Sequence, residues 1–393
     1  MNILAFDLPY CNHQNLVSLV DSGHTVYRCA HGDHSYLNRL GVKSLPELAY
    51  MDFLNSPDKP GLVKRIIDNY DIDVIVNSDP QEGWLWDEFS AEVTYIGPCS
   101  YVSSLEVNKF EGLKFVERCG VKVPEVLGRY NSRDFDSTTW NKPLVIKPVS
   151  RYCSTMVCQA GEDVALKIAL HKEYPHEIFV QEYIPDTREI SLNYTVINGG
   201  YLIYVIKQDG NLEPNYGVTR RAVRDWHTDV YAVDLDPEAE QIILTEAHKI
   251  VSELAKYPGN HEGHMSGFLT SEGELYFGEF AMRRYVHNSM PTYISGDAWL
   301  ACMQGDMETY SKVWRDRRII QTVVQTLHKL TDHYPMEFHD RYPEIYPPVG
   351  LQDNLLTSMG GVIISTEEQH RHIMDAFVHD LETSTRFTAN RPY

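Results

Sequence analysis

Short apolar runs alternate with amphipathic segments over the first hundred residues. Four short strands rich in apolar and β-branched residues are expected, at residues 3–6, 25–28, 74–77 and 93–96. Residues 14–21 and 62–70 repeat apolar side chains at helical spacing and predict helices. This alternation is typical of a parallel, doubly wound sheet. Ligands bind such sheets beyond the carboxyl ends of the strands.

After residue 100 the pattern changes to helices and longer strands. A helix is expected at residues 105–119, followed by Gly120, which suits a helix C-terminus. Four strands should follow, at residues 143–147, 178–183, 190–197 and 201–207, with a helix near 162–172.

The pattern of the second half is a long helix, a hairpin and then mainly helices. Asp236 suits an N-cap and Pro237 a first helical position, so a helix should run to about residue 257. The remaining expected elements are a hairpin with strands at 267–270 and 274–280, helices between 297 and 333, a proline- and tyrosine-rich loop at 334–350, a strand at 361–365 and a helix from 366.

Composition excludes several classes of protein. The chain has 393 residues, with 55 acidic and 35 basic side chains and a formal net charge of −20, so binding to a nucleic-acid polymer is not expected. No apolar run is long enough to span a membrane, and the start of the chain lacks the pattern of a signal peptide. The seven cysteines show no disulfide or zinc spacing, which favours a cytoplasmic location.

Several charged residues have the chemistry of a nucleotide site. Lys147 ends an apolar strand, Glu182 ends the next strand, and Glu189 follows shortly after. Phosphates need lysines, ribose hydroxyls need a carboxylate, and adenine needs a strand edge. Mg²⁺ prefers hard carboxylate oxygens, which Glu279 could provide. For such a site the chain offers Lys109, Lys147, Glu182, Ile184 and Glu189 for ATP, Glu279 for Mg²⁺ and Arg283 nearby for an anionic transition state.

The order of these residues resembles the ATP-grasp superfamily, most closely the phosphoribosylamine–glycine ligases (glycinamide ribonucleotide synthetases). The motifs that carry the resemblance are Leu105-Glu-Val-Asn-Lys109, Val145-Ile-Lys-Pro148, Gln181-Glu-Tyr-Ile184 and Tyr276-Phe-Gly-Glu-Phe280 with Arg283. It implies an α/β fold in three parts: a pre-ATP-grasp domain at 1–100, a two-lobed ATP-grasp domain at 101–305 with its small lobe at about 125–190, and a small C-terminal region at 306–393.

The resemblance also implies roles for individual residues. Lys109 and Lys147 would bind ATP phosphates, Glu182, Tyr183 and Ile184 would form the adenine hinge, and Glu189 would meet the ribose. The remaining assignments are Ser154 and Thr155 in the lid over the phosphates, Arg220 and Arg221 beside Arg283 as catalytic cations, and Asn12, His13, Gln14, Asp79 and Pro80 for the amine substrate. Besides His13, His264 is a candidate for a site residue.

Three positions depart from the family pattern. The lid segment at residues 149–157 contains no glycine, although its hydroxyls could still bind phosphate. Ser266 stands where many of these enzymes have an acid, and Ala281 stands where an asparagine is usual. The pattern Glu279-x-Ala281-x-Arg283 is also similar to that of L-amino-acid ligases, another branch of the superfamily.

The resemblance implies an ATP- and Mg²⁺-dependent ligase that joins a small amino acid, glycine by analogy, to an amine through an acyl phosphate. The amine stays open between phosphoribosylamine, a modified nucleotide and a second amino acid. Three alternatives remain: a non-catalytic relative that binds nucleotide or a partner, a dipeptide ligase, and a carboxylase or phosphotransferase. A homodimer is a possible assembly.

Overall fold

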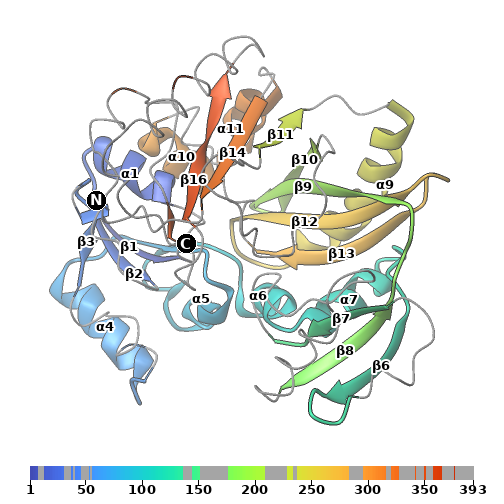
Figure 1. Ribbon diagram of the computed structural model, residues 1–393. Coiled ribbons are helices and arrows are strands. Elements are labelled where there is room, and N and C mark those ends of the chain that lie inside the picture. The colour runs from blue at the N-terminus through green and yellow to red at the C-terminus, as the bar shows by residue number, and fades with distance from the viewer. Residues whose placement is uncertain are drawn as a thin grey trace, which may run out of the picture.

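Three β-sheets organise the part of the chain that the structure describes (Figure 1). In this computed structural model the described residues are 1–7, 13–30, 37–38, 40–45, 53, 55–135, 144–150, 176–208, 228–232, 237–282, 295–315, 320–326, 341, 349–350, 357–364 and 376.

The first sheet is the parallel sheet that the sequence predicts. Its strands are β1 (Asn2–Asp7), β2 (Thr25–Ala30), β3 (Lys43–Ser44), β4 (Val74–Asn77) and β5 (Thr94–Ile96), in the order β3-β2-β1-β4-β5. Every pairing between them is parallel. Helix α1 (His13–Asp21) packs into the core on one side of the sheet, and α4 (Lys59–Asn69) and α5 (Leu85–Phe89) pack on the other. Covering both faces explains why the central strands β1 and β4 contain continuous apolar runs.

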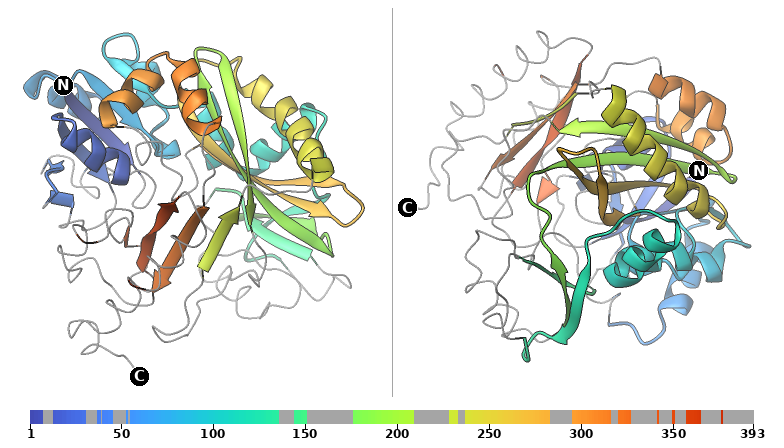
Figure 2. Two further views of the ribbon diagram at one scale, coloured as in Figure 1. Left: turned by 90° about the horizontal axis from the view of Figure 1, so that it is seen from above. Right: turned by 90° about the vertical axis from the view of Figure 1, so that its right-hand side faces the viewer.

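A helix from late in the chain completes the layer around α1. Helix α10 (Gly296–Met303) lies so close to α1 that a Cβ atom at Gly296 would be 2.5 Å from the carbonyl oxygen of Ser18. Trp299 and Leu300 enter the same apolar cluster as Leu16 and Leu19. Figure 2 shows this helix, in orange, beside the blue N-terminal segment. The N-terminal sheet is therefore closed by a segment that begins almost 300 residues later.

A small lobe holds a three-stranded antiparallel sheet. Its strands are β6 (Val126–Asn131), β7 (Leu144–Pro148) and β8 (Glu177–Glu182), in the order β6-β8-β7. Ile146, Ile178 and Val180 pack with Phe135 in a core of their own. The sequence analysis predicts β7 and β8 but not β6, because Gly128, Arg129 and Asn131 obscure the alternation in that strand.

The largest sheet has eight strands and extends into the C-terminal region. Its order is β13-β12-β9-β10-β11-β14-β16-β15. The strands are β9 (Thr187–Ile197), β10 (Gly200–Gln208), β11 (Thr228–Ala232), β12 (His261–Thr270), β13 (Leu275–Ala281), β14 (Ile320–Thr326), β15 (Val349–Gly350) and β16 (Thr357–Ile364). Helix α9 (Pro237–Leu254) packs on β9, β12 and β13 through Ala247 and Ile250. The region at 306–393 therefore shares a sheet with the preceding region.

Two expectations about secondary structure are wrong. The helix expected at 105–119 is divided at Asn108 into α6 (Ser100–Val107) and α7 (Lys109–Arg118), because Asn108 has non-helical angles and its side chain accepts the N–H of Glu111 as an N-cap. Helices were also expected up to residue 333. Helix α11 (Met307–Arg315) fits, but Ile320–Thr326 forms β14 between β11 and β16. Pairing with two strands overrides the local prediction. The helix expected near 162–172 lies outside the described residues.

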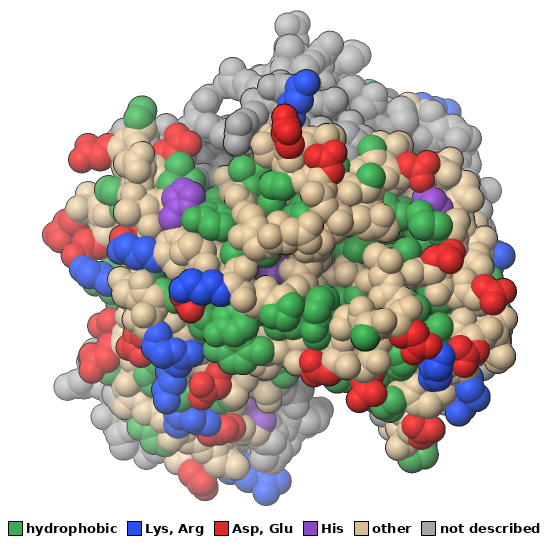
Figure 3. Space-filling model, turned by 180° about the vertical axis from the view of Figure 1, so that it is seen from behind, with side chains coloured by type: hydrophobic (Ala, Val, Ile, Leu, Met, Phe, Trp, Pro, Cys, Tyr) green, Lys and Arg blue, Asp and Glu red, His purple; other side chains and the backbone are tan. Residues whose placement is uncertain are grey.

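On the face opposite to the one seen in Figure 1, hydrophobic and charged side chains are both exposed (Figure 3). Hydrophobic side chains gather across the middle of this face, and Asp and Glu side chains lie mainly around its margin. The acidic excess is therefore not gathered into one patch on this face. Among the described helices, none combines the length and the apolar character needed to cross a bilayer.

Candidate functional site

Two lysines from different parts of the fold meet the same edge strand. The ammonium of Lys109, at the start of α7, lies 2.6 Å from Oε2 of Glu279 in β13. The ammonium of Lys147, in β7, donates a hydrogen bond of 3.2 Å to the carbonyl oxygen of Gly278. The Lys147 side chain is buried and that of Lys109 is only 9% exposed, although both carry charge. The fold therefore brings together three residues that the sequence analysis selected: Lys109, Lys147 and Glu279.

Backbone hydrogen bonds hold the two lysines close together. The N–H of Lys109 donates to the carbonyl oxygen of Val149 at 2.8 Å, just beyond the end of β7. The N–H of Val149 in turn donates to the carbonyl oxygen of Glu177 at 2.9 Å. The first turn of α7 is thus joined to the strand that carries Lys147, which places both ammonium groups at one end of the small lobe.

A β-bulge at Gly278 determines which side chains of β13 face the lysines. Ser266 of β12 lies opposite Glu279, whereas Gly267 lies opposite Phe277, so Gly278 is an extra residue in the ladder. Phe277 and Phe280 are three residues apart, yet their rings are 4.7 Å apart in the same core. In a regular strand they would lie on opposite faces. The bulge lets both rings enter the core while Glu279 points away from it.

Only glycine fits at the bulge without movement of β12. A Cβ atom at Gly278 would lie 2.8 Å from the hydroxyl oxygen and 3.1 Å from the carbonyl oxygen of Ser266. Gly278 is not among the site residues expected from the sequence. The available signal was a glycine inside a strand pattern between Phe277 and Glu279, which often marks a bulge.

The Glu279 carboxylate is held in its ionised form. Burial alone would raise its pKa, but the charges of Lys109 and Lys147 and the hydrogen bond from Lys109 outweigh burial and lower the pKa from 4.5 to about 2. His264 also contributes to lowering this pKa. The side chain is still 36% exposed, so a ligand can reach part of it. A negative oxygen beside two ammonium groups suits a site for phosphates and a cation.

The donor set fits a cation that is held jointly with a nucleotide. Among the described residues, no group of three or more His, Cys, Asp or Glu side chains converges as a metal site. Mg²⁺ is commonly held by one or two carboxylates together with substrate phosphates and water. Glu279 could be such a carboxylate. Ser266 and Ala281, the departures seen in the sequence, add no second carboxylate beside it.

The residues expected to form an adenine hinge lie at the end of β8. The backbone N–H of Glu182 donates to the carbonyl oxygen of Glu125, in the segment before β6, at 3.0 Å. Its carboxylate accepts the Glu125 N–H at 2.9 Å. Tyr183 and Ile184 follow and are half-buried. The Glu182 side chain therefore ties the end of β8 to the segment before β6, and the backbone of Tyr183 and Ile184 is left as the candidate for an adenine contact.

The expected amine-substrate loop follows β4, at the carboxyl edge of the parallel sheet. Asp79 is buried, and its carboxylate accepts the Gln81 N–H at 2.9 Å, which caps a 3₁₀ turn at Pro80–Glu82. Glu82 is also buried and accepts the indole N–H of Trp84 at 2.5 Å. Asp79 and Pro80 therefore shape this loop, and their contact with a substrate stays a prediction.

Several selected residues cannot be placed. Asn12, Ser154, Thr155, Arg220, Arg221 and Arg283 lie outside the described residues. His13 and Gln14 begin α1, and Glu189 pairs with Phe268 in the large sheet, but only the backbone of these three residues is described.

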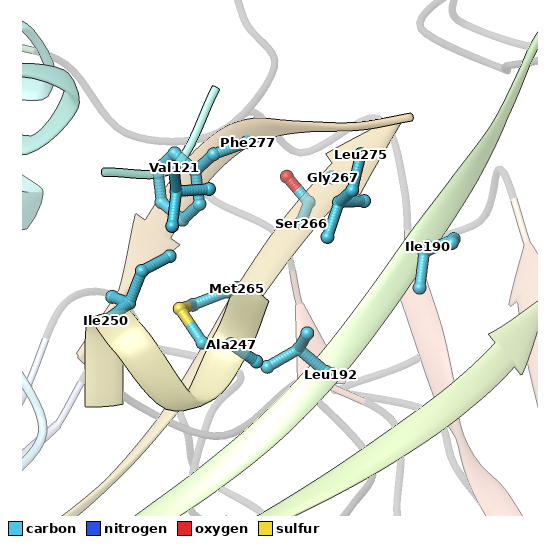
Figure 4. A pocket seen from close by; sticks show the side chains of 10 residues that line it. All are labelled: Val121, Ile190, Leu192, Ala247, Ile250, Met265, Ser266, Gly267, Leu275 and Phe277. Atoms are coloured by element: carbon cyan, nitrogen blue, oxygen red, sulfur yellow. The ribbon is translucent and has the colours of Figure 1, made fainter. Parts of the chain in front are cut away.

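A small apolar cavity lies between α9 and the large sheet (Figure 4). Its volume is about 20 Å³. The residues that line it are Val121, Ile190, Leu192, Ala247, Ile250, Met265, Ser266, Gly267, Leu275 and Phe277. Such a volume suits about one water molecule. We therefore interpret it as a packing gap in the core and not as a nucleotide site.

Comparison with known proteins supports the fold and not a specific family. No protein family matches the chain, and no curated protein matches it by sequence. Among solved structures, an N5-carboxyaminoimidazole ribonucleotide synthetase in complex with ADP matches with a TM-score of 0.65 and 13% identity, over 96% of each chain. An L-amino acid ligase from Bacillus licheniformis matches with a TM-score of 0.64 and 14% identity, over 97% of this chain and 96% of the other.

A third match extends the comparison to carboxylases. The biotin carboxylase domain of the Hydrogenobacter thermophilus 2-oxoglutarate carboxylase has a TM-score of 0.64 and 12% identity, over 97% of this chain and 89% of the other. That structure contains ADP, its magnesium salt and bicarbonate. The expected fold is therefore confirmed: the chain has the mixed α/β architecture of the ATP-grasp enzymes.

Proposed function

We propose that this protein binds ATP with a divalent cation and uses it to join a carboxylate to an amine. The observation that carries the proposal is the meeting of Lys109 and Lys147 with Gly278 and Glu279 at the edge of β13. Two buried ammonium groups beside an ionised carboxylate suit a polyphosphate and its counter-ion. The neighbours that bind ADP support the choice of nucleotide.

The proposed reaction has two steps. A carboxylate oxygen of the first substrate attacks the γ-phosphorus of ATP, and ADP leaves with the electrons of the broken bond. The amine nitrogen then attacks the carbonyl carbon of the acyl phosphate, inorganic phosphate leaves, and the amine loses a proton to solvent or a nearby base. Lys109 and Lys147 would neutralise charge on the phosphates and orient the transferred group. Glu279 would hold the cation, which supplies further neutralisation when bound.

For the substrates, we propose a small amino acid such as glycine as the carboxylate donor, in line with the resemblance to glycinamide ribonucleotide synthetases. The L-amino acid ligase among the structural neighbours supports an amino acid in this role. Bicarbonate is a second candidate carboxylate, because one neighbour is named for forming a carboxyamino product and another was solved with bicarbonate. In that case the amine would receive a carboxyl group.

The first test is nucleotide binding. Millimolar Mg-ATP should raise the melting temperature of the protein, because a ligand that binds only the folded state stabilises it. Lys147→Met should abolish this rise, whereas Lys256→Met, which changes an exposed lysine in a surface ion pair, should leave it unchanged. An unchanged melting curve of the parent protein would reject ATP binding.

The second test is turnover. ADP release would be measured with mixtures of amino acids, amines and bicarbonate, and the products identified by mass spectrometry. An amide product supports ligation, a bicarbonate-dependent carboxyl product supports carboxylation, and a phosphorylated end product would indicate a phosphotransferase. Nucleotide binding without ADP release in any mixture would favour a non-catalytic relative.

A further inference from the structure

An imidazole lies on the same face of the large sheet as Glu279. His264 of β12 lies opposite Asn193 of β9 and opposite Ala281 of β13. Two residues along β12, Ser266 lies opposite Glu279. Side chains two apart on a strand share a face, and so do side chains directly opposite each other. His264 and Glu279 are therefore diagonal neighbours across the β12–β13 ladder.

The opposite face of β12 belongs to the core. Met265, between His264 and Ser266, is buried and packs with α9 residues around the small cavity. His264 itself is half-buried. Diagonal neighbours on one face of an antiparallel pair lie roughly 7 Å apart at Cα, within reach of long side chains. The register therefore brings His264 and Glu279 close enough for their side chains to share a ligand.

The other neighbours of Glu279 on this face offer weak donors or none. Ser266, directly opposite, has a neutral hydroxyl, and Ala281, two residues along, has no donor in its side chain. In the described part of the chain no third carboxylate, thiol or imidazole converges with Glu279. Of the described side chains on this face, His264 is therefore the one that could bind a cation strongly together with the Glu279 carboxylate, and it would do so through a ring nitrogen.

We infer that His264 supplies a nitrogen ligand to the cation that Glu279 and the nucleotide phosphates would hold, so that the site prefers Mn²⁺ or Co²⁺ to Mg²⁺. Imidazole nitrogen suits transition-metal ions better than Mg²⁺, which prefers oxygen. The inference rests on the proposed nucleotide site and names the cation class that this site selects.

The test measures directly whether a histidine nitrogen binds the cation. The full-length protein would be prepared with ¹⁵N-labelled histidine and mixed with Mn²⁺ and a non-hydrolysable ATP analogue. Electron spin echo envelope modulation of bound Mn²⁺ should then show coupling to a histidine nitrogen. Mn²⁺ affinity in the presence of the analogue would be measured by room-temperature electron paramagnetic resonance, with Mg²⁺ as competitor.

Two variants and one matched control accompany the parent. His264→Ala should remove the nitrogen coupling and weaken Mn²⁺ binding about tenfold or more, on the scale seen when the surroundings of metal ligands are altered. His264→Gln keeps a polar side chain and adds an oxygen donor. It should lose the coupling but bind Mg²⁺ relatively better. His248→Ala is the control, because His248 is an exposed imidazole on α9, on the other side of the sheet.

The outcomes separate the two proposals. If the parent binds the Mn²⁺–nucleotide complex but shows no histidine coupling, or if His264→Ala keeps the coupling, the inference about His264 is wrong and the nucleotide site stands. If the parent binds no nucleotide with either Mn²⁺ or Mg²⁺, both proposals are wrong. Loss of coupling in both His264 variants, with retention in His248→Ala, supports the inference.

Discussion

The Lys109 ammonium and the Glu279 carboxylate are 2.6 Å apart, although 170 residues separate them in the chain. Their contact joins the first turn of α7 to the edge strand β13. The Lys109 side chain is only 9% exposed, so this pair lies at the rim of the core.

We expect a measurable coupling between these two residues. Glu279→Gln leaves the buried Lys109 without its counter-charge, and Lys109→Met removes the main stabilising charge from Glu279. Removing one partner of a buried pair costs several kcal/mol, but the partial exposure of Glu279 reduces the expected loss to about 1–2 kcal/mol. The free energy of unfolding in urea would be measured for both single variants and the double variant. The double variant should lose less than the sum of the two.

The exposed pair Lys256–Glu253 is the control for this cycle, since its side chains are 67% and 38% exposed. Its coupling should be well under about 1 kcal/mol. If the losses in the free energy of unfolding of the two single variants simply add in the double variant, the contact between Lys109 and Glu279 does not stabilise the protein.

Gly278→Ala should destabilise the protein by about 1–3 kcal/mol, because the new methyl group would be forced against Ser266. It should also weaken nucleotide binding, since the Gly278 carbonyl oxygen and Lys147 would shift apart. The measurements are urea unfolding and the Mg-ATP melting shift. Combining Gly278→Ala with Ser266→Gly removes the closest contact and should recover part of the stability. A fully stable single variant would show that β12 and β13 can separate easily.

Tyr310→Phe should cost about 1–3 kcal/mol, because the Tyr310 hydroxyl donates to the buried Glu262 carboxylate and accepts from Thr195 at 2.8 Å. These contacts join α11 to β12 and β9. Thermal unfolding would measure the loss. In the Glu262→Gln background Tyr310→Phe should reduce stability by less, because a neutral amide oxygen is destabilised less than a buried carboxylate when its hydrogen-bond donor is removed. An equal cost in both backgrounds would assign the loss to other Tyr310 contacts.

His261 should make stability depend on pH between about 6.5 and 4. Burial lowers its pKa from 6.5 to about 4, while a hydrogen bond to the Gly259 carbonyl oxygen opposes this shift. In that window the unfolded chain takes up a proton that the folded protein refuses, so the free energy of unfolding falls as pH falls. This loss is nearly complete below about pH 4 and is at most about 3.4 kcal/mol.

His261→Phe keeps a ring against Tyr194 and has no proton to gain. The measurement is urea unfolding at pH 7 and pH 4.5. The loss of stability between these two values should be smaller in the variant than in the parent protein. Equal losses would mean that His261 is protonated in the folded state.

Local patterns predicted much of the fold. The apolar runs at β1 and β4 and the helical spacing of α1 and α4 depend on neighbours a few residues away, so the parallel sheet could be predicted. Strand β6 and the break at Asn108 could not, because their stability comes from contacts with β8 and from a side-chain cap. Strand β14 is the clearest case, since its pairing with β11 and β16 decided between helix and strand.

The candidate site shows the same difference between what the local sequence predicts and what tertiary contacts decide. By itself the sequence determined which side chains carry suitable chemistry: Lys109, Lys147, Glu182 and Glu279 have the required charges in a suggestive order. Only the tertiary structure decided what each of them touches. The bulge at Gly278 turns Glu279 towards the lysines, the Glu182 carboxylate is used on Glu125, and the register of β12 against β13 puts His264 beside Glu279. Side-chain charge is a local property, whereas register and the approach of distant strands depend on how the whole chain packs.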